Sequence, residues 1–291
     1  MLVSGKTNPH IPPTPSLSHV SVQKAIPKIK KDFFEDSFLF CCVLLRICYC
    51  SHMTKNRRYK VIGVSSAKTQ KGESLGYLTG IVYLSPSDTG ETGLNLCPWA
   101  GNCKKICLNT AGLGAFSSVQ KGRKRKTHAW AFDREGFLEN AKRDVLSLIR
   151  KAEKESLTPC VRMDGTSDLG IALVKGKGGR LVDQFPRIQF YDYTKSVSRM
   201  ERFLAGEFPK NYHLTFSHDG EENWGDCLKV LERGGNVAVV FRKTIPQEWR
   251  GFPVVDGDVS DLRFLDPKGG FIVGLKAKGK AKKDKSGFVI D

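Results

Sequence analysis

The chain has 291 residues, of which 40% are hydrophobic and 26% charged, enough to build one large domain or two modest ones. This composition excludes disorder throughout the chain. Lys and Arg exceed Asp and Glu by 47 to 30, a net charge of +17, so the surface attracts polyanions such as nucleic acid, nucleotides or phosphorylated substrates. A generically basic surface accounts for the same excess.

The nine cysteines fall into three groups. Four lie in an apolar run near the N-terminus, Cys160 and Cys227 are isolated, and three lie in one short loop. An odd count, uneven spacing and the lack of a cleavable secretory signal are typical of reduced thiols, not of a disulfide framework. We therefore expect a cytoplasmic protein.

Residues 1–52 differ in composition from the rest of the chain. A proline-rich stretch precedes an apolar segment of 13 residues, 38–50, which Arg46 interrupts. This segment is too short to span a bilayer and too far from the N-terminus for an ordinary signal peptide, so we expect no membrane contact. We interpret residues 1–52 as a disordered or weakly folded extension, Met53 as the natural start, and residues 53–291 as a single α/β domain. The extension holds six basic and three acidic residues, so the net charge without it falls from +17 only to +14.

From residue 59 onward, apolar runs of strand length alternate with helical segments. Each crossover returns the chain to the same end, so these units predict an α/β fold with a mainly parallel sheet, in a (β/α) barrel-like or partial-barrel arrangement. The helical patterns cover residues 117–155, as one helix or a pair, 200–204 and 224–231. The strand patterns cover residues 77–84, 158–163, 187–193, 211–216, 236–241, 254–255 and 271–275.

Polar residues follow nearly every apolar run. In parallel α/β sheets and barrels, binding sites are built at the carboxyl ends of the strands, so several of these residues are expected to face one cavity. Strands that simply end in solvated loops produce the same pattern. The residues predicted to shape a substrate pocket are Asp192, Lys195, Ser217 and Arg242.

The loop after the first strand holds Cys97, Cys103 and Cys107 in a C-x5-C-x3-C spacing. A structural zinc site needs four ligands, commonly two close pairs, and no second pair is visible, but Cys160 or His128 could complete such a site in three dimensions. Three thiolates instead suit a [4Fe–4S] cluster with one iron left open to bind S-adenosylmethionine. Reduced thiols in a tight turn are the third interpretation.

The second strand is followed by Asp164, Gly165, Thr166, Ser167 and Asp168. This turn offers hydrogen bonds to a small ligand, such as the amino group of a cofactor. An Asx or Ser/Thr turn that caps the next helix fits the same residues.

A basic run consists of Lys121, Arg123, Lys124, Arg125 and Lys126, followed by aromatic residues. Such a run can hold a nucleic-acid backbone, and it is also the pattern of an ordinary solvated helix face. The lysines at 276–283 suit phosphate contact or solubility equally. There is no P-loop, GxSxG elbow, HExxH motif or dinucleotide fingerprint, so NTPase, hydrolase and dehydrogenase activities lack their usual signatures.

Several segments together resemble a protein family of phages and bacterial mobile elements, akin to the gene-product-88-like phage proteins. The resemblance runs from about residue 63 to Asp291 and implies no particular reaction. It rests on the cysteine loop and on the segments KGESLGYLT (71–79), VRMDGTSD (161–168), FYDYTK (190–195), NYHLTFS (211–217) and DLRFLDP (261–267).

A more distant resemblance is to radical S-adenosylmethionine enzymes, whose partial (β/α) barrel carries a three-cysteine cluster loop after its first strand. That resemblance implies an iron–sulfur cluster on the three loop cysteines, S-adenosylmethionine held by residues 164–168, and hydrogen abstraction from an anionic or nucleotide-like substrate. The commonest spacing in that group is C-x3-C-x2-C, which differs from the spacing here. The alternative function is a zinc-stabilised nucleic-acid-binding protein without catalytic activity.

Overall fold

The computed structural model describes residues 58–64 and 67–291. The chain divides into two units, Met1–His52 and Met53–Asp291, and the helices and strands named below all belong to the second. The predictions about residues 1–52 and about Met53 lie outside the described residues.

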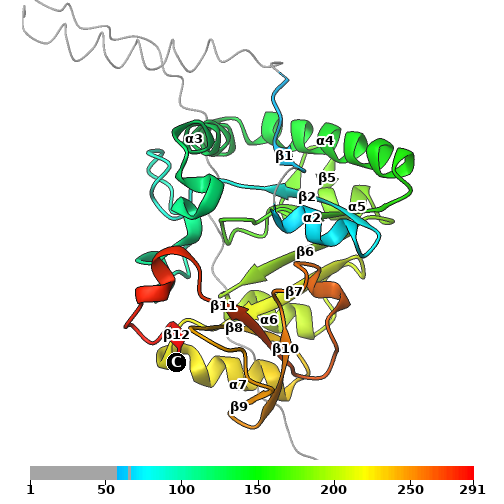
Figure 1. The fold of residues 1–291 in the computed structure, drawn as a ribbon. Helices are drawn as coiled ribbons and strands as arrows, with labels where there is room; N and C mark the ends of the chain where they lie inside the picture. The colour runs from blue at the N-terminus through cyan, green and yellow to red at the C-terminus, as the bar shows by residue number, and fades with distance from the viewer. Residues whose placement is uncertain (1–57, 65–66) are drawn as a thin grey trace, which may run out of the picture. The chain divides into compact units, whose positions relative to one another are not determined.

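The second unit is built on one large, mostly parallel sheet (Figure 1). Five parallel strands lie side by side in chain order, β2, β3, β6, β7 and β8, and are followed by β11 and β10. Antiparallel strands β1 and β9 lie at the two edges, and the short β12 pairs with β8. The strands are β1 (Ile62–Gly63), β2 (Tyr77–Val82), β3 (Thr158–Arg162), β6 (Gln189–Thr194), β7 (Tyr212–Ser217), β8 (Val237–Phe241), β9 (Glu248–Trp249), β10 (Phe252–Asp256), β11 (Ile272–Lys276) and β12 (Val289–Ile290), with a separate hairpin of β4 (Lys175–Gly176) and β5 (Gly179–Arg180).

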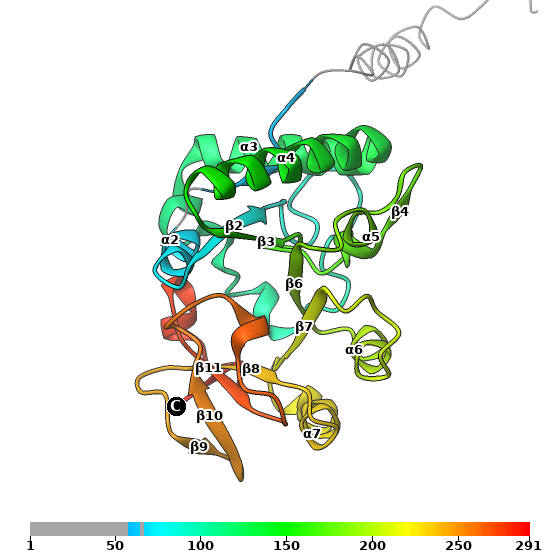
Figure 2. The same cartoon turned by 90° about the vertical axis from the view of Figure 1, so that its right-hand side faces the viewer.

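The helices that connect the parallel strands cover the outer face of the sheet (Figure 2), whereas α2 precedes β2 and packs on that strand. Right-handed crossovers between neighbouring parallel strands place their helices on the same side, which leaves the strand ends open to a common cavity. Helix α4 packs on β2 and β3, α6 on β6 and β7, and α7 on β7 and β8. The helices are α2 (Ala67–Glu73), α3 (Ser117–Phe132), α4 (Arg134–Lys154), α5 (Leu181–Gln184), α6 (Val197–Leu204) and α7 (Trp224–Glu232).

The core lies between these helices and the sheet. On α4, Phe137, Ala141, Val145 and Leu148 recur at helical spacing and are all buried. The strands read as nearly continuous apolar runs because both of their faces are covered. Asp133 separates α3 from α4: its side chain accepts a hydrogen bond from the N–H of Gly136 at 3.0 Å and caps the second helix.

The prediction of an α/β fold with a mainly parallel sheet is confirmed. Each predicted strand is present with its ends within two residues of the prediction, and residues 117–155 form a helix pair. Within the described residues, the sheet is open, because no ladder joins β1 to β9. The segment between β3 and β6, which contains the β4–β5 hairpin and α5, was not predicted, because its elements are too short to show a hydrophobic period.

Candidate functional site

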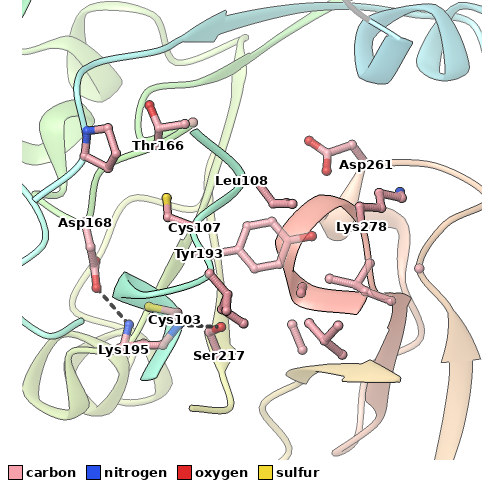
Figure 3. Close-up of a pocket in the computed structure, with 18 of the residues that line it drawn as sticks. Cys103, Cys107, Leu108, Thr166, Asp168, Tyr193, Lys195, Ser217, Asp261 and Lys278 are labelled. Carbon is pink, nitrogen blue, oxygen red and sulfur yellow. Dashed lines mark hydrogen bonds between the residues drawn. The ribbon is translucent and has the colours of Figure 1, made fainter. Parts of the chain in front are cut away.

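A cavity of about 380 Å³ lies at the carboxyl ends of the parallel strands (Figure 3). Its walls come from the ends of β3, β6, β7, β8 and β11, from the cysteine loop, and from the C-terminal segment. This is the edge at which the strand pattern predicts a site. The predicted residues that line the cavity are Cys97, Cys103, Cys107, Gly165, Thr166, Ser167, Asp168, Lys195 and Ser217.

The three loop cysteines are free thiols, half-buried in the same cavity wall. Cys97 Sγ accepts the N–H of Ser87 at 3.3 Å and lies 3.6 Å from the carbonyl oxygen of Thr166. The adjacent Leu96 carbonyl accepts the N–H of Asp168 at 2.9 Å. The start of the cysteine loop is therefore attached to the turn that follows β3.

Asp219, just beyond β7, holds the middle of the cysteine loop. Its carboxylate accepts the backbone N–H of Asn102 and of Cys103, each at 3.0 Å, and its carbonyl accepts the Asn102 side-chain amide at 2.9 Å. A Cβ on Gly101 would overlap the Asp219 carboxylate, so the close approach requires glycine at that position. Asp219 thus sets where Cys103 lies.

The end of the loop is held by Arg123 of α3. This arginine is 8% exposed, and its guanidinium donates to the carbonyl and to the side-chain oxygen of Asn109, two residues after Cys107. It also lies over the Tyr83 ring, 5.4 Å from the centroid. Arg123 is thus part of the loop's support and is not available on the surface.

Burial raises the pKa of the Cys97 thiol to about 12 and that of Cys103 to about 11. Among the smaller contributions, Cys107 raises both of these pKa values, whereas Lys195 lowers that of Cys103. The thiols therefore lie within electrostatic reach of one another. In residues 58–64 and 67–291, however, no three His, Cys, Asp or Glu side chains are grouped closely enough to hold one metal ion.

The two residues named as possible fourth zinc ligands do not line the cavity. Cys160 is buried beside Tyr191 and Leu262, with its Sγ 3.3 Å from the hydroxyl of Thr79. His128 lies on α3, where its ring packs against Phe132 with the centroids 5.6 Å apart.

Asp168, Lys195 and Ser217 come together beside the thiols (Figure 3). The Asp168 carboxylate accepts the N–H of Lys195 at 2.9 Å and pairs with Arg199 at 2.6 Å. Lys195 Nζ donates to Ser217 Oγ at 3.1 Å and lies 3.9 Å from the Asp219 carboxylate. Because β6 and β7 are adjacent parallel strands, their last residues reach the cavity side by side.

Asp164 and Asp192 lie beneath the cavity wall and do not line it. The Asp164 carboxylate accepts the Ser167 hydroxyl and the backbone N–H groups of Leu169, Gly170 and Ile171. Asp192 accepts the N–H of Asp164 at 2.7 Å. Burial raises the pKa of both carboxyls, because a charged group is disfavoured away from water. Asp164 therefore orders the segment up to Ile171 from within, although none of these hydrogen bonds is the one to the N–H two residues on that defines an Asx turn.

Arg242, which directly follows β8, also lies outside the cavity wall. Its guanidinium donates to the carbonyls of Lys282 and Asp284, each at 2.7 Å, and pairs with the Asp291 carboxylate. This arginine attaches the C-terminal segment to the sheet. It reaches the cavity only through that segment, which contributes Phe288 to the wall.

The basic run on α3 does not form a continuous solvent-facing strip. Arg123 is buried, Lys124 pairs with Glu91, and Lys126 donates to the carbonyl of Val61 at 3.4 Å. Burial lowers the pKa of Lys126 to about 8. Lys121 and Arg125 are the members of the run that remain exposed.

Four residues of the site are not among the predicted site residues: Asp219, which supports the loop, and Tyr193, Arg162 and Asp261, which line the cavity. Arg162 pairs with Asp261 at 2.9 Å, and its guanidinium lies 4.4 Å from the centroid of the Tyr193 ring. Asp219 lies two residues after Ser217, directly beyond a predicted strand. Because sites in parallel sheets lie at the carboxyl ends of the strands, its position near the cavity could have been predicted. No local pattern marks its contact with a loop 116 residues away.

A model of the family described as "Gene product 88" matches residues 51–291. The chain belongs to the Gene product 88 family. This match supports the predicted resemblance to gene-product-88-like phage proteins and covers the whole described region, including the cysteine loop and the cavity.

The searches of curated proteins and of solved structures found no match. The likeness to radical S-adenosylmethionine enzymes therefore has no support from these comparisons. None of the helices in the described part of the chain has the length and apolar character that crossing a membrane requires.

Proposed function

We propose that this Gene product 88 protein is an iron–sulfur enzyme that uses S-adenosylmethionine and acts on an anionic or nucleotide-like substrate. The observation that carries the proposal is the position of the thiols. Cys97, Cys103 and Cys107 line one cavity at the carboxyl ends of parallel strands that lie in chain order, an arrangement compatible with a partial (β/α) barrel.

The donor set fits a cluster better than a single ion. Four thiolates around one zinc lie about 3.8 Å apart, as follows from a Zn–S bond of about 2.3 Å in a tetrahedron. In a [4Fe–4S] cluster each thiolate binds a different iron, so the ligands are more widely spread and three of them leave one iron open. The three thiols share a wall without converging on one point, and Ser87 N–H already donates to Cys97 Sγ.

When bound, such a cluster supplies the electron for reductive cleavage of the sulfonium of S-adenosylmethionine. Residues of this chain would hold the cofactor's amino-acid end. Lys195 and Ser217, with Nζ and Oγ 3.1 Å apart in the wall, suit a carboxylate, and Asp168 suits an ammonium group. Asp164 and Asp192 would act one layer below, by fixing the backbone of the turn that Asp168 ends.

Three apolar side chains form another part of the wall, where they would limit the access of water to a bound cluster. They are Ile106, Val240 and Phe288, and the first of these packs with the C-terminal segment in one small apolar cluster. A dry site strengthens charge interactions and protects a reactive intermediate from solvent. The arrangement is suited to chemistry that must exclude water.

Metal content is the direct test. Protein purified without oxygen is expected to contain iron and sulfide and to absorb broadly near ~400 nm, as thiolate-bound clusters do. Cys103→Ala is expected to lose the absorbance and the iron, whereas Cys160→Ala, which alters a thiol outside the cavity, keeps both. Colourless protein with stoichiometric zinc that Cys160→Ala releases would instead establish the zinc alternative.

Cofactor binding tests the second part of the proposal. Lys195→Met removes the ammonium group and keeps most of the apolar stem. We expect a loss of S-adenosylmethionine affinity of about tenfold or more with unchanged iron content, because a charge-assisted hydrogen bond is lost. Lys177→Met, a substitution of an exposed lysine on the β4–β5 hairpin, is the matched control. Equal affinity of wild type and Lys195→Met for S-adenosylmethionine would show that Lys195 does not bind the cofactor.

A further inference from the structure

Two segments frame the mouth of the cavity, the cysteine loop (97–107) and the C-terminal segment (276–288). They pack against each other: Ile106 joins Ala277, Ala281 and Val289 in one apolar cluster, and the turn Gly279–Lys283 contacts Leu108–Thr110. Figure 1 shows the red C-terminal turn beside the loop that precedes α3. We call these two segments together the rim.

The rim carries a strong excess of positive charge. The one acid within its two segments, Asp284, is 6% exposed and accepts hydrogen bonds from Ser286 and Val289. Lys104 pairs with Asp88 and Lys278 with Asp258, and in the described part of the chain no ion pair involves the other six rim lysines. The eight lysines, all exposed, are Lys104, Lys105, Lys276, Lys278, Lys280, Lys282, Lys283 and Lys285.

An aromatic side chain stands on the same rim. Trp99 is 52% exposed, although it lies between Cys97 and Ala100, both of which line the cavity. Exposing half of an indole to water carries a free-energy cost unless the ring is covered by a partner. Among the flat partners available, nucleic-acid bases stack on aromatic rings regardless of sequence.

The positive charge continues from the rim into the cavity. The lining keeps a smaller positive excess, because its five cations outnumber its three acids, Asp168, Asp258 and Asp261. Arg162 is paired with Asp261, and the other cations of the lining are Lys71, Lys195 and the two rim lysines Lys276 and Lys278. An anionic bilayer surface could contact only the cations of the rim. A chain of phosphates with one unit turned into the cavity could contact both the rim cations and the cavity cations. The observations therefore favour a flexible polyanion with stackable units.

We propose that the rim binds single-stranded nucleic acid, with its lysines on the phosphates and Trp99 under a base, so that one nucleotide enters the cavity. This inference deepens the proposed function by naming the substrate class of the same site, and in that respect it rests on the proposed function. The binding itself involves neither the thiols nor a bound metal.

The first test measures the affinity of the full chain for a fluorescein-labelled single-stranded DNA of about 20 nucleotides, longer than the ~4–16 nucleotides that one binding fold covers. Lys280, Lys282 and Lys283 are all changed to glutamate. We expect at least a tenfold weaker affinity near ~0.1 M salt. The salt dependence should fall by roughly 2 in slope, because each phosphate that a lysine no longer neutralises removes about 0.7.

The control variant makes the same charge change at Lys154, Lys177 and Lys210, which are exposed on other parts of the molecule. It is expected to bind within about twofold of wild type, because charges beyond about one Debye length are screened. An equal loss in both variants would mean that net charge alone drives binding and would overturn the proposal. Absence of binding by wild type would overturn it as well.

Trp99→Ala tests the stacking interaction. We expect about fivefold or more weaker binding with an unchanged salt slope, because the variant removes one base–aromatic stack and leaves every lysine on its phosphate. Trp99→Phe is expected to recover part of the affinity. Binding that is insensitive to Trp99, or equally tight binding to poly-glutamate or to vesicles with anionic headgroups, would overturn a nucleic-acid assignment.

Iron content separates this inference from the proposed function. The triple lysine variant and Trp99→Ala should keep their iron, and Cys103→Ala should lose iron and keep nucleic-acid binding. If the protein binds nucleic acid but contains no iron, the inference about the rim is supported and the proposed iron–sulfur chemistry is contradicted. If the protein contains iron but does not bind the oligonucleotide, the proposed chemistry is supported and the inference about the rim is contradicted.

Discussion

The cysteine loop (97–107) and the turn from Asp164 to Ile171 reach the same cavity, but they are held in different ways. The turn is organised from within, since one buried carboxylate, that of Asp164, accepts four hydrogen bonds from residues three to seven positions later. The loop is organised from outside, by Asp219, Asp168 and Arg123. The turn is also joined to the sheet, since Asp192 accepts the N–H of Asp164 and Arg199 pairs with Asp168. It therefore forms part of the fold, whereas a loop held mainly by outside contacts can move without unfolding the protein.

The difference predicts that the two regions respond differently to the loss of their supporting acids. Damage to the turn should lower the free energy of unfolding. Damage to the loop supports should change the environment of the thiols more than it changes stability. We expect the effects on stability to decrease from Asp164 through His218 and Asp219 to Gly101.

Asp164→Ala should have the largest effect. It leaves the buried N–H groups of Gly170 and Ile171 without an acceptor, and each such loss costs about 1–3 kcal/mol, so we expect the free energy of unfolding to fall by about 3 kcal/mol or more. Urea denaturation measures this change. Asp183→Ala, which alters an exposed acid paired with Arg180, should stay within about 1 kcal/mol. Similar losses in both variants would contradict the special role of Asp164.

His218 separates the stability of the end of β7 from the support that its neighbour Asp219 gives to the loop. The His218 ring is buried against Trp224 and Trp249, and burial lowers its pKa from 6.5 to about 4. The unfolded chain therefore binds a proton that the folded one does not between these values, so stability falls as the pH falls from about 6.5 to about 4. This contribution amounts to up to about 3 kcal/mol.

His218→Leu should remove that part of the acid sensitivity. Neither ring nitrogen of His218 has a hydrogen-bond partner within the described residues, so leucine loses no such bond. The measurement is urea denaturation of both proteins at several pH values in this interval. The stability of wild type relative to His218→Leu should fall by up to about 3 kcal/mol from pH 6.5 to pH 4. A relative stability that stays constant over this interval would show that His218 does not titrate there.

Asp219→Ala should affect the thiols more than the fold. The backbone N–H groups of Asn102 and Cys103 lose their acceptor but are near solvent, so we expect a stability loss of about 1–2 kcal/mol. In metal-free protein, alkylation of Cys103 by iodoacetamide, measured by peptide mass spectrometry, should become several-fold faster, and alkylation of Cys160 should not. Asp226→Ala on the exposed face of α7 is the control, and an unchanged Cys103 rate would show that the loop is held without Asp219.

Gly101→Ala should produce a smaller version of the same effect. The added methyl group would overlap the Asp219 carboxylate, so that carboxylate must withdraw from the loop. We expect faster alkylation of Cys103 with a stability loss near ~1 kcal/mol. Gly122→Ala on α3, where the added Cβ meets open space, should instead stabilise the protein by up to about 1 kcal/mol. Unchanged alkylation in Gly101→Ala would mean that the loop accommodates the methyl group.

Much of the fold follows from local patterns. The apolar runs place β2, β3, β6, β7, β8 and β11 nearly where they occur, and the strand-end rule locates the cavity edge. Polar residues near the end of the same strand nevertheless differ in whether they line the cavity. Lys195 lines the cavity just beyond the end of β6, whereas Asp192 lies deeper in the strand, where its buried carboxylate accepts the N–H of Asp164 and the Tyr212 hydroxyl.

The basic run on α3 illustrates what a pattern of charges leaves open. Lys121 and Arg125 are exposed, while Arg123, on the same helix, turns inward to Asn109 and the Tyr83 ring. A helix presents its residues at about 100° intervals, so a continuous run of cations always faces several environments. Which of them meets an acceptor depends on a loop that precedes the helix.

The sequence by itself determined the parallel α/β arrangement, the family, and the presence of three thiols on one short loop after the first parallel strand. Those features depend on hydrophobic period and local spacing, which the order of residues contains directly. Only the tertiary structure decided that the thiols share a wall with Lys195 and Ser217, that Asp219 holds them there, and that Arg242 supports the C-terminal segment. These contacts join residues 40 or more positions apart, and such pairings depend on how the strands are ordered in the sheet.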